Sequence, residues 1–165
     1  MLCVSAPQHI SDRILKVRKM IFSRYGIVSA MSFDEIIPLN FYSEPVDKAV
    51  FSNIWNNTPF RQLKKLYITS DAVYAAVETP PVLSLIRKKT GKPAARGLFE
   101  PGNGFFLSKL PDKTEEGSFT REVTELIGEN GEWRNSTLKM VEAEYENPGR
   151  WEEALIWTTL WEIKL

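Results

Sequence analysis

The stretch that decides the fold is the C-terminal one, residues 136–165, "STLKMVEAEYENPGRWEEALIWTTLWEIKL". Its centre, "NPGR" (147–150), combines Asn, Pro and Gly, which are typical turn residues. The segment after the turn has alternating apolar positions, namely Leu155, Trp157, Trp161, Ile163 and Leu165. Because successive side chains of a strand point to opposite faces, this spacing predicts a strand with one heavily apolar face. The stretch therefore predicts a long terminal hairpin with antiparallel pairing.

Upstream, the N-terminal part of the chain predicts a strand followed by a helix. The run "MLCVSA" (1–6) is typical of a short strand. Residues 10–25 predict a helix with Ser11 or Asp12 as N-cap and Gly26 just after its last turn. The inward stripe of this helix consists of Ile10, Ile14, Val17 and Ile21.

A second strand, "FDEIIPLNFYSEP" (33–45), contains a proline at its centre. Ile37, Leu39 and Phe41 alternate with their neighbours, which is the period of a strand with one buried face. Proline cannot donate a hydrogen bond to a ladder. Pro38 therefore places this strand at a sheet edge, at a bulge or beside an open cleft.

The middle of the chain predicts helices and strands in alternation. The first is a helix from Pro45 with Val46, Ala49, Val50 and Ile54 inward, followed by a strand pair at 64–70 and 72–78. A helix from Thr79 through Leu83 and Ile86 to Gly91 and a glycine-kinked strand at 95–110 come next. After a polar loop at 111–118, a helix capped by Ser118 has Val123, Leu126 and Ile127 inward and ends at Gly128.

The composition limits the classes of protein to which this chain can belong. A chain of 165 residues with 43% hydrophobic residues is typical of a packed globular protein, here a single two-lobed domain over 1–165. The 21 basic and 21 acidic residues cancel, so no global charge attracts nucleic acid or an anionic membrane. One cysteine, Cys3, excludes an internal disulfide, and no segment is long enough to span a bilayer. We expect a soluble, cytoplasmic protein.

The order of these elements resembles the two-histidine phosphoesterase superfamily, the proteins related to 2′-5′ RNA ligases and cyclic phosphodiesterases. "IIPLNF" (36–41) and "FEPGNGFFLSK" (99–109) stand where that family has strands that carry a His-x-Thr motif to a shared cleft. The resemblance implies an α+β fold with two lobes, mainly antiparallel sheets and helices on the outside. It also implies acid–base attack on a phosphodiester by two imidazoles, with the threonines holding the phosphate.

The motif positions lack every one of these groups. In the first strand they are Ile36 and Pro38, and in the second they are Gly102 and Gly104. The chain contains one histidine, His9, far from both strands in sequence, so the count alone excludes two-histidine catalysis. The resemblance therefore implies a degenerate, non-catalytic member of the family. Such a protein either binds a nucleotide or RNA in a vestigial cleft or has a cleft that is closed by side-chain packing. The candidate cleft residues are Asn40, Tyr42, Asn103, Phe106 and Ser108.

Three alternatives stay open. Glu35 and Glu100, with Asp34 beside the first motif, could replace the imidazoles as acid and base, or they could simply lie in water at strand ends. A basic cluster could bind phosphate, although such residues also suit a helix C-terminus: Arg87, Lys88, Lys89, Lys92 and Arg96. The terminal hairpin could serve as a protein interaction module, which an exposed apolar strip on 151–165 would favour. Nothing in the sequence indicates a cofactor or a metal site.

Overall fold

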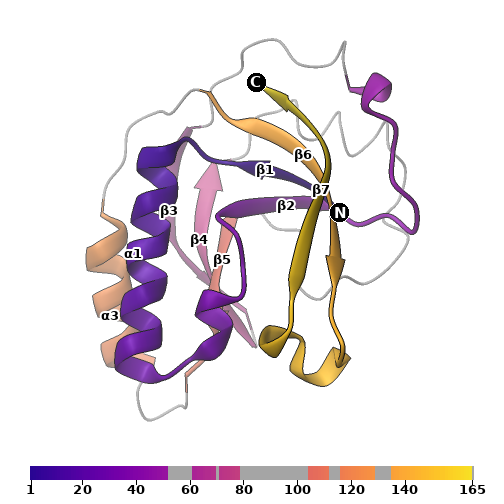
Figure 1. Ribbon diagram of the computed structural model, residues 1–165. Helices are drawn as coiled ribbons and strands as arrows, with labels where there is room; N and C mark the ends of the chain where they lie inside the picture. The colour runs from indigo at the N-terminus through magenta and orange to yellow at the C-terminus, as the bar shows by residue number, and fades with distance from the viewer. Residues whose placement is uncertain (52–60, 70, 79–103, 112–115, 129–134, 165) are drawn as a thin grey trace.

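The computed structural model describes residues 1–51, 61–69, 71–78, 104–111, 116–128 and 135–164. Among these residues the fold is α+β, with two antiparallel sheets and two α-helices (Figure 1). The predicted helix at 79–91 and the first part of the predicted strand at 95–110 lie outside the described residues. In chain order the elements are β1 (Leu2–Ser5), α1 (Gln8–Tyr25), the 3-10 turn η1 (Val28–Met31), β2 (Ile36–Asn40), the 3-10 turn η2 (Lys48–Val50), β3 (Arg61–Ile68), β4 (Ala72–Glu78), β5 (Gly104–Lys109), α3 (Glu116–Ile127), β6 (Thr137–Glu144), the 3-10 segment η3 (Pro148–Glu153) and β7 (Ile156–Lys164).

The larger sheet has the strand order β2-β1-β6-β7, and each neighbouring pair is antiparallel. β2 lies at the edge of this sheet, and its residue Pro38 pairs with Cys3 of β1. Of the three positions that the sequence allowed for Pro38, an edge, a bulge or an open cleft, the edge is therefore observed, and an edge strand needs its N–H groups on one side only. The register of this pair also shifts between Leu2 and Cys3, so Leu39 is an extra residue on β2.

The predicted terminal hairpin is present, and β6 pairs with β7 from Thr137–Lys164 to Glu144–Ile156. The pairing contains a β-bulge in its middle. Met140 pairs with Trp161, whereas the next residue, Val141, pairs with Thr159, so Leu160 of β7 is an extra residue. An extra residue reverses which side chains point to which face of the sheet.

The prediction of one apolar face along the last strand is wrong because of this bulge. Trp161 and Ile163 pack on the face of the sheet that meets the helices. Trp157 packs on the opposite face, against Phe33, with ring centroids 5.3 Å apart. Each half of β7 therefore contributes to a different buried cluster.

The smaller sheet has the order β3-β4-β5 and is antiparallel throughout. The predicted strand pair is confirmed as β3 and β4, which pair from Arg61–Glu78 to Ile68–Val73. Thr69 closes the turn between them, since its hydroxyl accepts a hydrogen bond from the Ala72 amide at 3.0 Å. β3 and β5 form the two edges of this sheet, and β5 lies next to β2 of the larger sheet.

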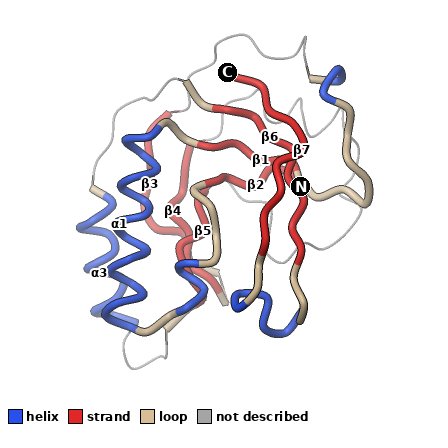
Figure 2. The backbone as a smooth tube through the Cα atoms, in the orientation of Figure 1, coloured by secondary structure: helices blue, strands red, loops and turns tan. Residues whose placement is uncertain are grey.

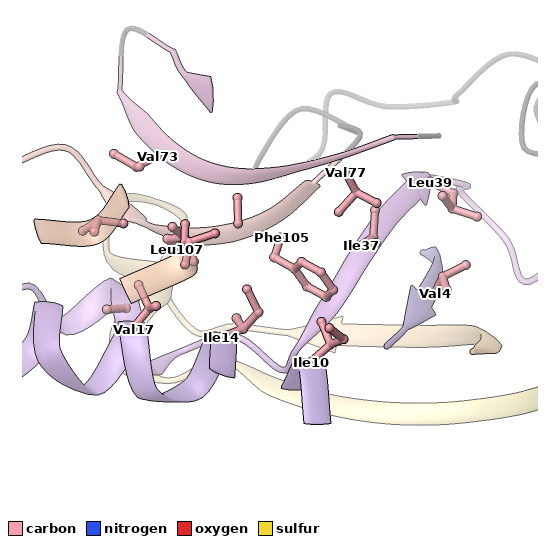
Figure 3. Packing of buried hydrophobic residues seen from close by; sticks show 14 of the residues in the cluster. Val4, Ile10, Ile14, Val17, Ile37, Leu39, Val73, Val77, Phe105 and Leu107 are labelled. Atoms are coloured by element: carbon pink, nitrogen blue, oxygen red, sulfur yellow. The ribbon is translucent and has the colours of Figure 1, made fainter. Parts of the chain in front are cut away.

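The two helices lie side by side against the smaller sheet, where α1 contacts β5 and α3 contacts β3 (Figure 2). The predicted stripe of α1 is confirmed, and it packs against apolar residues of β1, β2, β4, β5, β6 and α3. Figure 3 shows Ile10, Ile14 and Val17 pointing toward Phe105 and Leu107 of β5. We call this cluster the main core. Full burial contributes about 1.5–3 kcal/mol for each large aliphatic side chain.

The ends of the helices are partly as predicted. Gly26 and Gly128 both have left-handed backbone angles after the last turn, with φ of 66° and 61°, as the sequence predicts. The predicted N-cap of α1 is wrong, because the helix begins at Gln8 after Pro7, whose carbonyl accepts from the amides of Ile10 and Ser11. α3 begins at Glu116, before the predicted cap at Ser118.

The predicted helix from Pro45 is not formed in the described residues up to Phe51. The chain is extended there and then makes the short 3-10 turn η2, and the Asp47 carboxylate accepts from the Ala49 amide at 2.8 Å. Val50, which was expected inward, is exposed, whereas Phe51 is buried in the main core. Ile54 lies outside the described residues.

Cys3 gives a test of how firmly β1 is held. Its side chain is fully buried, and this burial raises the pKa of the thiol to about 12. Because the thiolate is the reactive form, we expect native protein at mildly alkaline pH to react with a thiol reagent roughly a hundredfold more slowly than protein unfolded in guanidinium. The measurement is the rate of release of the coloured thiol product, with Cys3→Ser as the blank. Equal rates in the two states would show that β1 leaves the sheet readily.

Candidate functional site

The motif positions that the resemblance implies lie on two strands that face each other. β2 and β5 are the edges of their sheets and are in contact. Ile36 on β2 and Gly104 on β5 are both buried. Gly102 and the cleft candidate Asn103 lie outside the described residues.

The space on the far side of these strands from the main core is filled by aromatic rings. Phe33 is at the centre, with ring centroids 4.6 Å from Phe106 and 5.1 Å from Trp151. Tyr74 contacts Phe106 at 5.7 Å, and Trp157 contacts Phe33. We call these five residues the aromatic cluster. Aromatic pairs of this kind contribute about 0.5–1.5 kcal/mol each beyond their burial.

The aromatic cluster adjoins a smaller buried group formed by Cys3, Ile36 and Val141. Trp157 of the aromatic cluster also packs against this group, and Met1 packs against both. Phe106, which was expected to present its ring in a cleft, is 2% exposed. Its ring is occupied by other aromatic residues and offers no surface to a base or sugar.

Arg18 of α1 connects the two facing strands from within the protein. Its side chain is 1% exposed, and its Nε and Nη2 donate to the Phe106 carbonyl at 3.1 and 2.6 Å. The other donations go to the Phe33 carbonyl, to the Asp34 carbonyl at 3.1 Å, and to the Glu35 carboxylate at 3.4 Å. One guanidinium therefore holds the backbone of β5 and the entry to β2 together.

Burial lowers the pKa of Arg18 to about 10, while the charges of Glu35 and Asp34 act in the opposite direction. The guanidinium thus stays charged at neutral pH. Arg18 is one of several basic residues of the helix predicted over 10–25 and was not a candidate site residue. Only the folded structure shows that this one points inward, because its partners are backbone carbonyls that leave no trace in the sequence.

The remaining cleft candidates are also inside the protein. Asn40 is buried, its Nδ2 donates to the Tyr42 hydroxyl at 2.9 Å, and its Oδ1 accepts from the Phe41 amide. Tyr42 packs on the main core. Ser108 is fully buried, and its hydroxyl has no hydrogen-bond partner among the described atoms.

Gly104 stands at a position where no side chain fits. A Cβ added there would lie 2.5 Å from the carbonyl oxygen of Ala75 and 3.1 Å from the Cα of Ala76, both of the neighbouring strand β4. Contacts to backbone at this distance cannot be relieved by a side-chain rotation. Glycine at this position is therefore a packing requirement of the sheet, as close approach of two backbones predicts.

The titratable candidates are dispersed. His9 is exposed on α1, and Glu35 is held by Arg18. Glu100 and the basic cluster, Arg87, Lys88, Lys89, Lys92 and Arg96, lie outside the described residues. Within the described ranges, no three His, Cys, Asp or Glu side chains gather in a way that could hold a metal ion.

An open groove of about 650 Å³ lies elsewhere, between η1 and the tip of the terminal hairpin. One wall comes from the segment 28–34 and the other from 144–146 and 152–157. Ser32 joins the walls at the base, since its hydroxyl donates to the Glu152 carbonyl at 2.6 Å and its carbonyl accepts from the Trp157 indole at 3.2 Å. Phe33 of the first wall and Leu155 and Trp157 of the second also belong to the packing of the aromatic cluster.

The lining of this groove is strongly acidic. It includes five carboxylates and no lysine or arginine: Asp34, Glu144, Glu146, Glu152 and Glu153. Two of the five are paired from outside the lining, Glu152 with Lys109 at 2.6 Å and Glu153 with Arg150. Burial acts to raise the pKa of Glu152, but the hydrogen bond and charge of Lys109 outweigh it and leave this pKa below its usual value. The Glu152 carboxylate is therefore ionised at neutral pH.

The sequence analysis did not find this groove. A signal was present for one wall, because the segment around the turn carries glutamates at 142, 144, 146, 152 and 153 against a single Arg150. The opposite wall, 28–34, is separated from the hairpin by more than a hundred residues, so its position depends on the folded chain.

Comparison of the chain with family models, with curated proteins and with solved structures gives no significant match. No helix in the described part of the chain is both long and apolar enough to cross a membrane.

Proposed function

We propose that this protein is a non-catalytic binding protein with the two-lobed arrangement of the two-histidine phosphoesterases, in which packing has closed the catalytic cleft. The observation that carries the proposal is the aromatic cluster, which packs Phe106 of β5 against Phe33 from just before β2 and Trp157 of the hairpin against Phe33. A phosphodiester substrate would need the space that Phe33, Phe106 and Trp157 fill.

The chemistry of the motif positions supports the same proposal. Acid–base attack on a phosphodiester needs groups that titrate near the working pH. Ile36 and Pro38 have none, and Gly104 has no room even for a methyl group. Glu35, the described member of the carboxylate alternative, already forms an ion pair with the buried guanidinium of Arg18 at 3.4 Å.

The order of the described elements is compatible with the family's arrangement. A strand and a long helix precede β2, an antiparallel strand pair precedes β5, and a hairpin completes the larger sheet. β2 and β5 lie next to each other, as two motif strands that share a cleft would.

We expect purified protein to show no hydrolysis of 2′,3′-cyclic nucleotides or of short 2′-5′-linked RNA. The assay is product release followed by chromatography, with a two-histidine phosphodiesterase as the positive control. Turnover that survived His9→Ala and disappeared in Glu35→Gln would contradict the proposal and favour carboxylate catalysis.

A second candidate function is protein interaction through the terminal hairpin, and one observation favours it. Ile156 of β7 is 62% exposed, and Leu160 is exposed on the same strand. Exposed apolar residues of this size on one element are typical of an interaction surface.

A nucleotide or RNA ligand remains a prediction that depends on the basic cluster at 87–96.

A further inference from the structure

We propose that the groove between 28–34 and the hairpin tip binds an extended segment of a partner protein in which lysine or arginine side chains stand next to aliphatic ones. The inference deepens the proposed function, because it assigns a site and a partner chemistry to a binding protein. It depends on the groove, of whose lining Phe33, Leu155 and Trp157 also pack in or against the aromatic cluster.

The charge of the groove determines the sign of the partner. Of its five carboxylates, Glu144 and Glu146 form no ion pair with any described lysine or arginine. Carboxylates with the same charge that line one groove repel each other, and a cationic side chain between them relieves that repulsion. The same field repels phosphates, so neither nucleic acid nor an anionic membrane suits this surface.

The rim of the groove determines the other half of the partner chemistry. Ile156, Met31, Val28 and Tyr145 are large apolar residues that are exposed at the groove. Exposed apolar groups that are collected around one concavity indicate a surface that is buried on binding. A free polyamine or metal ion would satisfy the carboxylates but would leave most of this rim in water.

The outer edge of β7 determines the shape of the partner. β7 is the last strand of the larger sheet, so among the described residues no strand pairs with its outer edge. Ile156 and Trp157, at the start of that edge, line the groove. An extended backbone can hydrogen-bond to such an edge while its alternate side chains point into the groove and away from it.

The test uses the full chain and a fluorescein-labelled synthetic peptide in which lysine alternates with leucine, followed by fluorescence anisotropy. Two comparison peptides replace every lysine by glutamate or every leucine by serine. We expect the lysine–leucine peptide to bind, with affinity that falls as salt screens the charges. The glutamate peptide should not bind, and the serine peptide should bind about fivefold or more weakly because the rim stays in water.

Matched variants locate the site. The double substitution Glu144→Gln and Glu146→Gln should weaken binding about fivefold, as loss of two partly exposed ion pairs predicts. The control, Glu44→Gln with Glu125→Gln, removes the same charge from exposed positions outside the groove and should change binding less than about twofold. Ile156→Thr should weaken binding about fivefold, whereas Ile68→Thr, an exposed strand isoleucine of β3, should not.

Three results would overturn the inference. The first is that the lysine–leucine peptide does not bind, and the second is that the groove and control substitutions weaken its binding equally. The third is that the protein sediments as a dimer that the groove substitutions dissociate, which would identify a second copy of the chain as the occupant of the groove. Circular dichroism checks that each variant is folded. Failure of the peptide to bind would contradict the groove as a binding site but not the proposal of a closed catalytic cleft. Hydrolysis of cyclic nucleotides would contradict the proposed function but not the groove as a binding site.

Discussion

Replacement of Arg18 by methionine is expected to lower the free energy of unfolding by about 3–5 kcal/mol, because it removes several hydrogen bonds of a buried charged donor, each worth about 1.5–3 kcal/mol. Methionine keeps much of the side chain's length and apolar contact, so the loss reports the guanidinium. That group gives hydrogen bonds to the carbonyls of Phe33, Asp34 and Phe106. Without them, β5 and the entry to β2 lose the donors that hold them together. Denaturant unfolding followed by tryptophan fluorescence measures the effect.

The control is Arg24→Met on the same helix. Arg24 is exposed and pairs with Glu122 at 2.9 Å, so its loss should cost at most about 1 kcal/mol. Glu35→Gln should likewise cost about 1 kcal/mol or less, because Glu35 is partly exposed and is only one of the acceptors of Arg18. Equal effects of Arg18→Met and Arg24→Met would contradict the role given to Arg18.

The effect of Arg18→Met should not depend on pH in the neutral range. The pKa of Arg18 is lowered by burial to about 10, below its ordinary value, so the unfolded state holds the proton more tightly. This difference makes stability rise with pH only above about pH 10, where the folded state begins to lose the proton first. From about pH 6 to 9 both states carry the charge, and the difference between variant and parent stays constant.

The second large effect is expected from Gly104→Ala, which should destabilise the protein by about 1–3 kcal/mol. The new methyl group would lie 2.5 Å from the Ala75 carbonyl oxygen, so β4 and β5 must move apart. Glycine is ordinarily unfavourable inside a strand, and a substitution without the clash would gain stability. Gly104→Thr, which would restore the threonine that the family resemblance implies, should destabilise the protein further.

Gly117→Ala is the matched control for this prediction. Gly117 lies in the first turn of α3, and nothing stands within 4 Å of an added Cβ. Alanine is the better helix former by about 1 kcal/mol, so this variant should be as stable as the parent or more stable. If Gly104→Ala also proved neutral, the two strands would be further apart than the structure shows.

Much of the fold could be predicted from local patterns. The stripe of α1, the left-handed glycines 26 and 128, the strand pair β3–β4 and the terminal hairpin each depend on residues close together in sequence. Pro38 limited β2 to an edge, a bulge or a cleft, because a missing N–H restricts where a strand can lie, and the edge is what the structure has.

What could not be predicted depends on contacts between distant segments. The bulge at Leu160 is one extra residue among strand-forming neighbours, and composition does not mark it. The inward direction of Arg18 depends on carbonyls of β5 and of the entry to β2. The aromatic cluster brings together rings from before β2, from β4 and β5, and from the hairpin, so sequence could place Phe106 on a strand but could not show what covers it.

The bulge at Leu160 has a consequence for how the protein unfolds. A strand without it would place Trp157 and Trp161 on one face and would stabilise one cluster only. With it, the single strand β7 holds Trp161 in the main core and Trp157 against the aromatic cluster. Neither cluster can release its tryptophan without disturbing the strand that serves the other. The hairpin thus couples the two faces of the sheet into one cooperative unit. Local opening of one cluster displaces β7 and thereby destabilises the other cluster.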